Sequence, residues 1–215
     1  MPLSVGDFLD QLPIRSISLD VPDVVMASRT EGGDVLLDVV GTPLWRGEIA
    51  LDRMVPAEAR QAKALITVAQ GGGASFMCYD RAHPNPTSDP GGVLVASAAP
   101  TIRALVLDRR LIALEGFPAN YRLERGDYIS FQYETNPVRT AMHQVVEAEV
   151  LASAGGVMPF MEVRPLLQPG AVVGAAVSVS KPAFKAVILP GSVQSGRKRR
   201  FVTEGVSFQF VQTLR

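Results

Sequence analysis

Acid–base or nucleophilic chemistry near neutral pH would have to start from the two histidines or the single cysteine of this chain. Cys78 and His83 are close in sequence, with Asp80 and Asp89 nearby, and together they could supply a nucleophile, a base and an orienting carboxylate. Cys78, however, belongs to an apolar run typical of a buried strand, and His83 begins a proline-rich segment. We therefore predict that these residues do not form a catalytic site.

Neither the second histidine nor the glutamates give a stronger catalytic signal. His143 lies in the segment 142–150 and shares a face with Val145 and Glu147, which indicates a half-buried histidine hydrogen-bonded across a sheet. A glycosidase would need two carboxylates brought together across one cleft, and the scattered glutamates do not predict such a pair. They are Glu58, Glu115, Glu124, Glu147 and Glu149.

Metal and phosphate sites have equally little support. Asp80, His83 and Asp89 offer oxygen and nitrogen ligands, but their spacing matches no metal motif. The glycines at 71–73 lack the Gly-Lys-Ser/Thr sequence that completes a P-loop, and they follow a predicted helix instead of preceding one. We expect no catalytic residue, no cofactor and no metal ion, and hence no enzymatic activity.

Two further features could bind a ligand, although each has a structural interpretation that we prefer. The basic run Arg197, Lys198, Arg199 and Arg200 could contact phosphates, and a ring of copies would multiply that effect. A solvated loop or a charge-protected sheet edge is the commoner role of such a run. Aromatic residues could stack on sugars, but packing in a core or between subunits is more usual on strands. They are Trp45, Tyr128, Phe131 and Tyr133.

Composition limits the class of protein. With 215 residues, of which 47% are hydrophobic, the chain can bury a core in one or two domains. Lysine plus arginine equals aspartate plus glutamate at 21 each, so no net charge attracts nucleic acid or an anionic membrane. The lone cysteine excludes an intrachain disulfide and suits a reducing cytosol. We expect neither a cleaved signal peptide nor membrane insertion.

Period-two alternation between residues 16 and 54 predicts three or four antiparallel strands with one wet face. An alanine-rich stripe then predicts the one convincing helix, which starts at Pro56 and stops at the glycines 71–73. A strand over 75–79 follows. Turn-forming residues at 83–92 mark a boundary. Further strands are predicted at 93–96, 102–107, 128–133, 142–151, 159–164, 176–180 and 184–189, followed by a polar loop at 190–200.

The last ten residues alternate strongly, with Val206, Phe208 and Phe210 on one face, so they must enter a sheet. The best partners are the apolar runs before residue 55. We therefore predict a mainly β fold in which residues 1–82 and 190–215 form one β-sandwich or barrel with one α-helix, closed by the C-terminal strand. Residues 93–189 are predicted to form an inserted second β domain.

Several segments resemble, in the same order, blocks of the distal-tail-like proteins found at the tail tip of long-tailed, siphovirus-type bacteriophages. These segments are Leu44-Trp-Arg-Gly-Glu-Ile-Ala-Leu51, the helix 57–70, the segment 74–86, Leu123-Glu-Arg-Gly-Asp-Tyr-Ile-Ser130, 141–147, Met161-Glu-Val-Arg-Pro165 and 203–214. Together they cover most of the chain from residue 44 onward. In this family a tail-tube-like β domain forms a ring, and a second β domain faces outward.

The resemblance implies a structural virion protein of the baseplate or tail tip, assembled in the host bacterial cytoplasm. Its expected partners are copies of itself in a homohexameric ring, the tail tube protein, the tail-tip hub and central fibre proteins, and receptor-binding proteins. DNA would pass through the lumen without specific binding. The family brings no catalytic residues to transfer. One departure is that better-known members place the second domain after the first, so sugar binding is not carried over to 93–189.

Two alternatives remain open. A β-rich carbohydrate-binding or depolymerising protein that acts on the bacterial envelope would need an aromatic platform or a carboxylate pair on one exposed face. A tail-tube or tail-terminator protein shares the ring architecture, but it usually has no insertion of this size.

Overall fold

Alternating apolar and polar residues form most of the regular secondary structure of this chain. The computed structural model describes residues 2–215 and is 39% strand and 8% helical. Side chains of Val25, Leu37 and Val39 lie outside this description. The elements are η1 (Leu9–Gln11), β1 (Ile14–Asp20), β2 (Val25–Arg29), β3 (Val35–Val39), β4 (Arg46–Leu51), α1 (Pro56–Ala69), β5 (Phe76–Tyr79), β6 (Thr101–Leu105), β7 (Leu111–Glu115), β8 (Arg122–Glu124), β9 (Tyr128–Tyr133), β10 (Arg139–Val145), β11 (Glu149–Leu151), β12 (Met161–Arg164), β13 (Val177–Ser178), β14 (Ala183–Ile188), β15 (Gln194–Lys198) and β16 (Thr203–Gln212).

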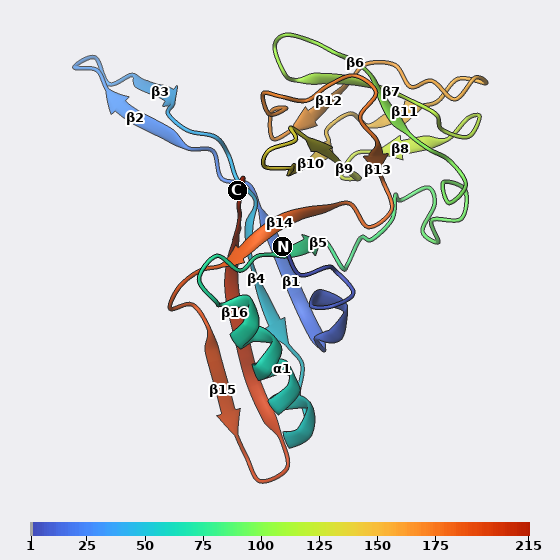
Figure 1. The fold of residues 1–215 in the computed structure, drawn as a ribbon. Coiled ribbons are helices and arrows are strands. Elements are labelled where there is room, and N and C mark those ends of the chain that lie inside the picture. Colours follow the sequence, from blue (N-terminus) through green and yellow to red (C-terminus); the bar gives the residue numbers. More distant parts are fainter. Residues whose placement is uncertain (1) are drawn as a thin grey trace.

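The first β unit is built around the C-terminal strand. Its six-stranded, nearly closed sheet has the order β1-β4-β16-β14-β5, and β15 pairs with β16 (Figure 1). Phe208 lies opposite Ile49 and Phe210 opposite Gly47 in the pairing of β16 with β4. The expected return of the last strand to the strands before residue 55 is therefore confirmed.

Burial follows the alternation of β16. Phe208 and Phe210 are fully buried and meet Phe8 and Phe76 in an aromatic core. The predicted helix is confirmed as α1, which starts at Pro56, where the missing N–H costs no helical hydrogen bond. It buries the Ala62, Ile66 and Ala69 stripe against this core. Within residues 2–215 no helix has the length and apolar character needed to cross a membrane.

The second β unit lies between β5 and β14 in the chain and has its own core. One sheet has the order β13-β9-β10-β12-β7-β6, and β8 pairs with β11 beside it. Its buried residues come from these strands and from the loops between them; they include Ile102, Ile112, Leu123, Ile129, Phe131, Val145, Met158, Met161 and Val163. The described chain is thus mainly β, with one α-helix and a second β unit inserted before the closing strand.

The end of the inserted segment differs from the sequence-based boundary at residue 189. Strand β14 pairs with β5 and β16, so it belongs to the first sheet. Phe184 and Ala186 are fully buried in the first core. Alternation shows that a strand has one buried face, but it does not show which of two sheets that face covers.

Local predictions were wrong at three further places. Residues 93–96 form turns instead of a strand, because backbone N–H groups of Val93, Leu94 and Val95 donate to the Asp89 carboxylate. The strand predicted over 142–151 is broken into β10 and β11. The predicted loop 190–200 contains β15, an edge strand whose residues are all exposed.

Strands β2 and β3 form a separate two-stranded hairpin that projects beyond the first sheet (Figure 1). In the described part of the chain it pairs with no other strand. The alternation of residues 35–39 had predicted a strand of a larger sheet with one wet face. The difference arises because a period-two pattern does not reveal how many strands a sheet contains.

Candidate functional site

The structure separates the cysteine from the histidine beside it in sequence. Cys78 is fully buried in β5, and burial raises the pKa of its thiol far above the usual range. The side chain of His83 is 73% exposed, and its Nδ1 lies 3.2 Å from Oδ2 of Asp80. A thiol that is held protonated in the core is a poor nucleophile, so this segment does not assemble the groups for covalent catalysis.

His143 is buried at the side of β10 that faces the loop after β12. Its Nδ1–H donates to the carbonyl oxygen of Pro165 at 2.7 Å, and its ring stacks on Phe131 with centroids 5.3 Å apart. Burial lowers the pKa of His143 to about 4, against the opposing effect of the Pro165 hydrogen bond. The imidazole is therefore neutral at pH 7 and supports the packing of two segments.

Acidification should destabilise the protein through His143. The unfolded chain binds this proton near pH 6.5, whereas the folded chain binds it only near pH 4. The free energy of unfolding should consequently fall by about 3 kcal/mol from this one group as pH decreases between these values. Urea denaturation of wild type and His143→Gln at several pH values measures this contribution as the difference in slope.

The exposed His83 provides the control for that experiment. His83→Gln removes an exposed imidazole and leaves the contacts of His143 with Pro165 and Phe131 in place. An unchanged slope in His143→Gln would contradict the inferred burial of a neutral imidazole.

The aspartates considered as possible metal ligands accept hydrogen bonds from backbone N–H groups. Asp89 accepts the three N–H groups of residues 93–95 at 3.0–3.2 Å. Asp80 accepts a hydrogen bond from the N–H of Ala82 at 2.9 Å, and its other carboxylate oxygen contacts Nδ1 of His83. Within residues 2–215 no group of three or more histidine, cysteine, aspartate or glutamate side chains is arranged to hold a metal ion.

The glutamates have separate positions. Glu124 and Glu149 lie opposite each other in the β8–β11 pair, and both contact Arg122 between them, at 3.7 and 3.2 Å. Glu58 accepts the N–H of Val55 at 3.1 Å at the start of α1. Glu147 accepts an N–H of β12, and Glu115 ends β7. The one close pair among these five glutamates thus shares the guanidinium of Arg122 as its ion-pair partner.

The aromatic residues do not form an exposed platform for sugars. Trp45, Phe131 and Tyr133 are each less than 5% exposed. Trp45 packs edge-on against the half-buried Tyr128 with ring centroids 5.7 Å apart. These rings contribute to cores and to the junction of the two units, as the sequence interpretation favoured.

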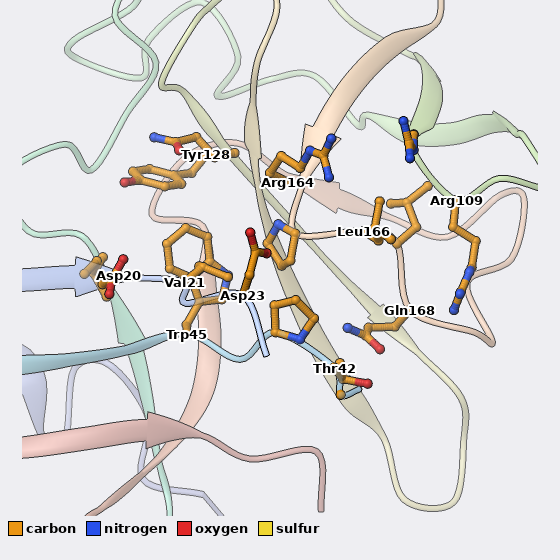
Figure 2. Close-up of a pocket in the computed structure, with 17 residues that line it drawn as sticks. Asp20, Val21, Asp23, Thr42, Trp45, Arg109, Tyr128, Arg164, Leu166 and Gln168 are labelled. Atoms are coloured by element: carbon orange, nitrogen blue, oxygen red, sulfur yellow. The ribbon is translucent and has the colours of Figure 1, made fainter. Parts of the chain in front are cut away.

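A cleft of about 740 Å³ lies between the two β units and is the most distinctive concave surface near that junction (Figure 2). The first unit contributes Asp20 and Asp23, and the second unit contributes Arg109, Arg110 and Arg164. No histidine or cysteine is among the described residues that line it. The cleft can therefore bind a polar or anionic group.

Sequence reasoning did not identify these arginines. They are far apart from the acids in sequence, and isolated charges carry no signal of convergence. Only the packing of β12 and the turn before β7 against the first unit brings them together. Arg164 is also 2.9 Å from Glu162, and Arg46 is 3.5 Å from Asp20, so part of the charge around the cleft is compensated.

Hydrogen bonds beside the cleft join the two units. Nε1–H of Trp45, which lines the cleft, donates to the carbonyl oxygen of Met142 at 2.7 Å. The buried Gln212 accepts the backbone N–H of Trp45 at 3.2 Å and donates to the carbonyl oxygen of Thr140 at 3.4 Å. Trp45, β16 and β10 thus share one hydrogen-bonded junction.

Substitution of Trp45 should weaken this junction. In Trp45→Phe the Met142 carbonyl loses the indole donor in a buried place, so the free energy of unfolding should fall by about 1–3 kcal/mol. Urea denaturation followed by circular dichroism measures the change. Tyr128→Phe is the matched control, because it keeps the ring that contacts Trp45 and should change stability by less than about 1 kcal/mol. Equal effects of the two variants would contradict the role of the indole hydrogen bond.

The basic run lies at the end of β15 and in the turn to β16. Arg199 is 3.1 Å from Glu204, and Arg200 lies over the ring of Phe201. Lys198, Arg199 and Arg200 also line a second, apolar groove of about 460 Å³ beside α1. The basic run therefore puts charge on a sheet edge, and three of its residues also form part of the rim of this groove.

Neither a protein-family model nor a curated protein matches this sequence.

Proposed function

We propose that this chain is a structural protein of a phage tail tip, a distal tail protein that forms a ring between the tail tube and the tail-tip hub and supports adsorption proteins. Copies of the chain would make a homohexameric ring. The first β unit would form the ring, and the second β unit would face outward. DNA would pass through the lumen without specific binding.

The observation that carries this proposal is the position of the resembling segments in the fold. They coincide with framework elements of both units: β4, α1 and β5 in the first, β8, β9, β10 and β12 in the second, and β16, which closes the first sheet. Similarity spread over loops alone would carry less weight. Framework strands determine which surfaces a unit can offer to its neighbours.

The chemistry of the surface is compatible with a scaffold. The net charge is zero, so no strong attraction to DNA would hinder its passage through a ring. Hydrogen bonds from Trp45 and Gln212 to backbone carbonyl groups of β10 join the proposed ring-forming unit to the proposed outward-facing unit.

Localisation in virions tests the proposal. Particles produced from a genome that carries this gene should contain the protein, and gold-labelled antibody against it should bind the end of the tail distal to the capsid. Deletion of the gene should give tails without a complete tip. Absence of the protein from purified particles would contradict the proposal.

The cleft favours the binding half of one alternative, a protein that binds anionic carbohydrate of the bacterial envelope. Arg109, Arg110 and Arg164 could pair with the acidic groups of an anionic polysaccharide. Saturable binding of such a polysaccharide by the monomeric protein, lost in Arg164→Ala, would favour this function over the ring.

A further inference from the structure

The β2–β3 hairpin leaves apolar and acidic side chains exposed at its surface. Met26 is 64% exposed and Leu36 is 58% exposed, and the pairing of Met26 with Asp38 and of Ser28 with Leu36 puts both apolar side chains on one face. An isolated two-stranded hairpin is marginally stable in water at best. This face therefore lacks the packing partner that a stable hairpin requires.

The same hairpin carries a net negative charge. Residues 25–39 contain three carboxylates and one guanidinium, which gives a net charge of −2 although the whole chain is neutral. The carboxylates belong to Glu31, Asp34 and Asp38. A partner for this surface should be apolar at its centre and basic at its rim.

The groove beside α1 has this complementary character. Its floor is apolar and buried, and its rim carries five cations among the described residues with no carboxylate. The floor includes Met54, Ala62, Ile66 and Val206. The cations are Arg60, Lys63, Lys198, Arg199 and Arg200.

The hairpin of a chain does not reach its own groove. In Figure 1 the hairpin projects beyond one end of the first sheet, whereas α1 and β15 lie at the opposite end. Only another molecule can place an acidic, apolar hairpin in the groove. Two different surfaces at opposite ends of one unit are the requirement for head-to-tail association, which closes into a ring or opens into a filament.

We propose that the β2–β3 hairpin of one copy docks into the groove between α1 and the β15–β16 hairpin of the next copy. Met26 and Leu36 would cover the apolar floor, and Asp34 and Asp38 would face the basic rim. This docking would supply the contact between neighbouring copies in the proposed function. It rests on that proposed function only for the closure of successive contacts into a ring.

Charge exchange between two variants tests this docking. The hairpin variant combines Asp34→Lys with Asp38→Lys, and the groove variant combines Arg60→Glu, Lys63→Glu and Lys198→Glu, which changes the net charge of the groove lining from +5 to −1. All five side chains are exposed, so both variants should keep the wild-type circular dichroism and melting temperature. Each variant alone places like charges together, and sedimentation should show self-association weakened by more than about tenfold.

An equal mixture of the two variants should recover the wild-type assembly. In the mixture the basic hairpin of the hairpin variant can dock into the acidic groove of the groove variant. The unchanged hairpin of the groove variant can dock into the unchanged groove of the hairpin variant. Both contacts then join opposite charges. Arg103→Glu is the control, because this exposed residue of β6 belongs to neither surface. It should leave self-association unchanged.

The outcomes separate this inference from the proposed function. If wild type and both variants assemble equally well, or if the mixture stays as dissociated as its components, the docking is wrong while the ring can stand. If wild type is monomeric at every concentration, docking and ring both fail. If the groove variant loses binding to a short DNA duplex but keeps self-association, the basic rim serves nucleic acid and the docking is overturned.

Discussion

Deletion of residues 206–215 is expected to prevent the first β unit from folding. The truncation removes most of β16, the strand that lies between β4 and β14. It also removes Phe208 and Phe210, which are fully buried. Truncation of one such side chain to alanine typically costs about 3–5 kcal/mol, and a whole domain is stable by only about 5–15 kcal/mol.

The deletion would also leave two sheet edges without a partner. Exposed edges of β4 and β14 present unpaired N–H and C=O groups that can pair with other chains. We therefore expect the truncated protein to aggregate, measured by size-exclusion chromatography and circular dichroism after expression. Deletion of 213–215, which follow β16, should leave a folded protein and serves as the control. A soluble, cooperatively folding protein without 206–215 would contradict this role of the last strand.

Gly47→Ala should have the second large effect. Gly47 lies in β4 between β1 and β16, opposite Leu19 and Phe210. A Cβ at this position would overlap the carbonyl oxygen of Ser18 and come 2.8 Å from Cζ of Phe210. Because the backbone of β1 cannot move without breaking its pairing, we expect a loss of about 3 kcal/mol, the upper end for overpacked cores.

Gly72→Ala is the matched control for that substitution. A Cβ on Gly72 meets no atom within 4 Å, and this glycine follows α1 at the surface. The free energy of unfolding of the Gly72→Ala protein should stay within about 0.5 kcal/mol of the wild-type value. Similar stability of Gly47→Ala and Gly72→Ala in thermal or urea denaturation would contradict the close approach of β1 and β4.

The elements that could be predicted from sequence are those with one buried face. α1 has an apolar stripe with period 3.6 and a proline at its start, and β16 has strict alternation, so both were identified with nearly correct ends. β15 is exposed along its whole length and carries no such pattern. β14 was recognised as a strand but assigned to the wrong sheet, since its partners β5 and β16 are distant in sequence.

The site was less predictable than the fold. The burial of Cys78 followed from its apolar neighbours, whereas His143 was expected to be half-buried and is fully buried, with its hydrogen bond to the loop after β12. The arginines of the cleft, and the groove beside α1, depend on how separate elements pack. Arg109 and Arg164, for example, line the same cleft as Asp23 only because the two units pack against each other. Local patterns contain no information about such contacts.

The central proposal, a closed ring of identical chains, is tested most directly by native mass spectrometry of the purified protein, with electron microscopy of the same sample. We expect a single assembly of six copies that images as a closed ring with a central channel. A protein that stays monomeric at all concentrations, with no ring in any image, would contradict the proposal.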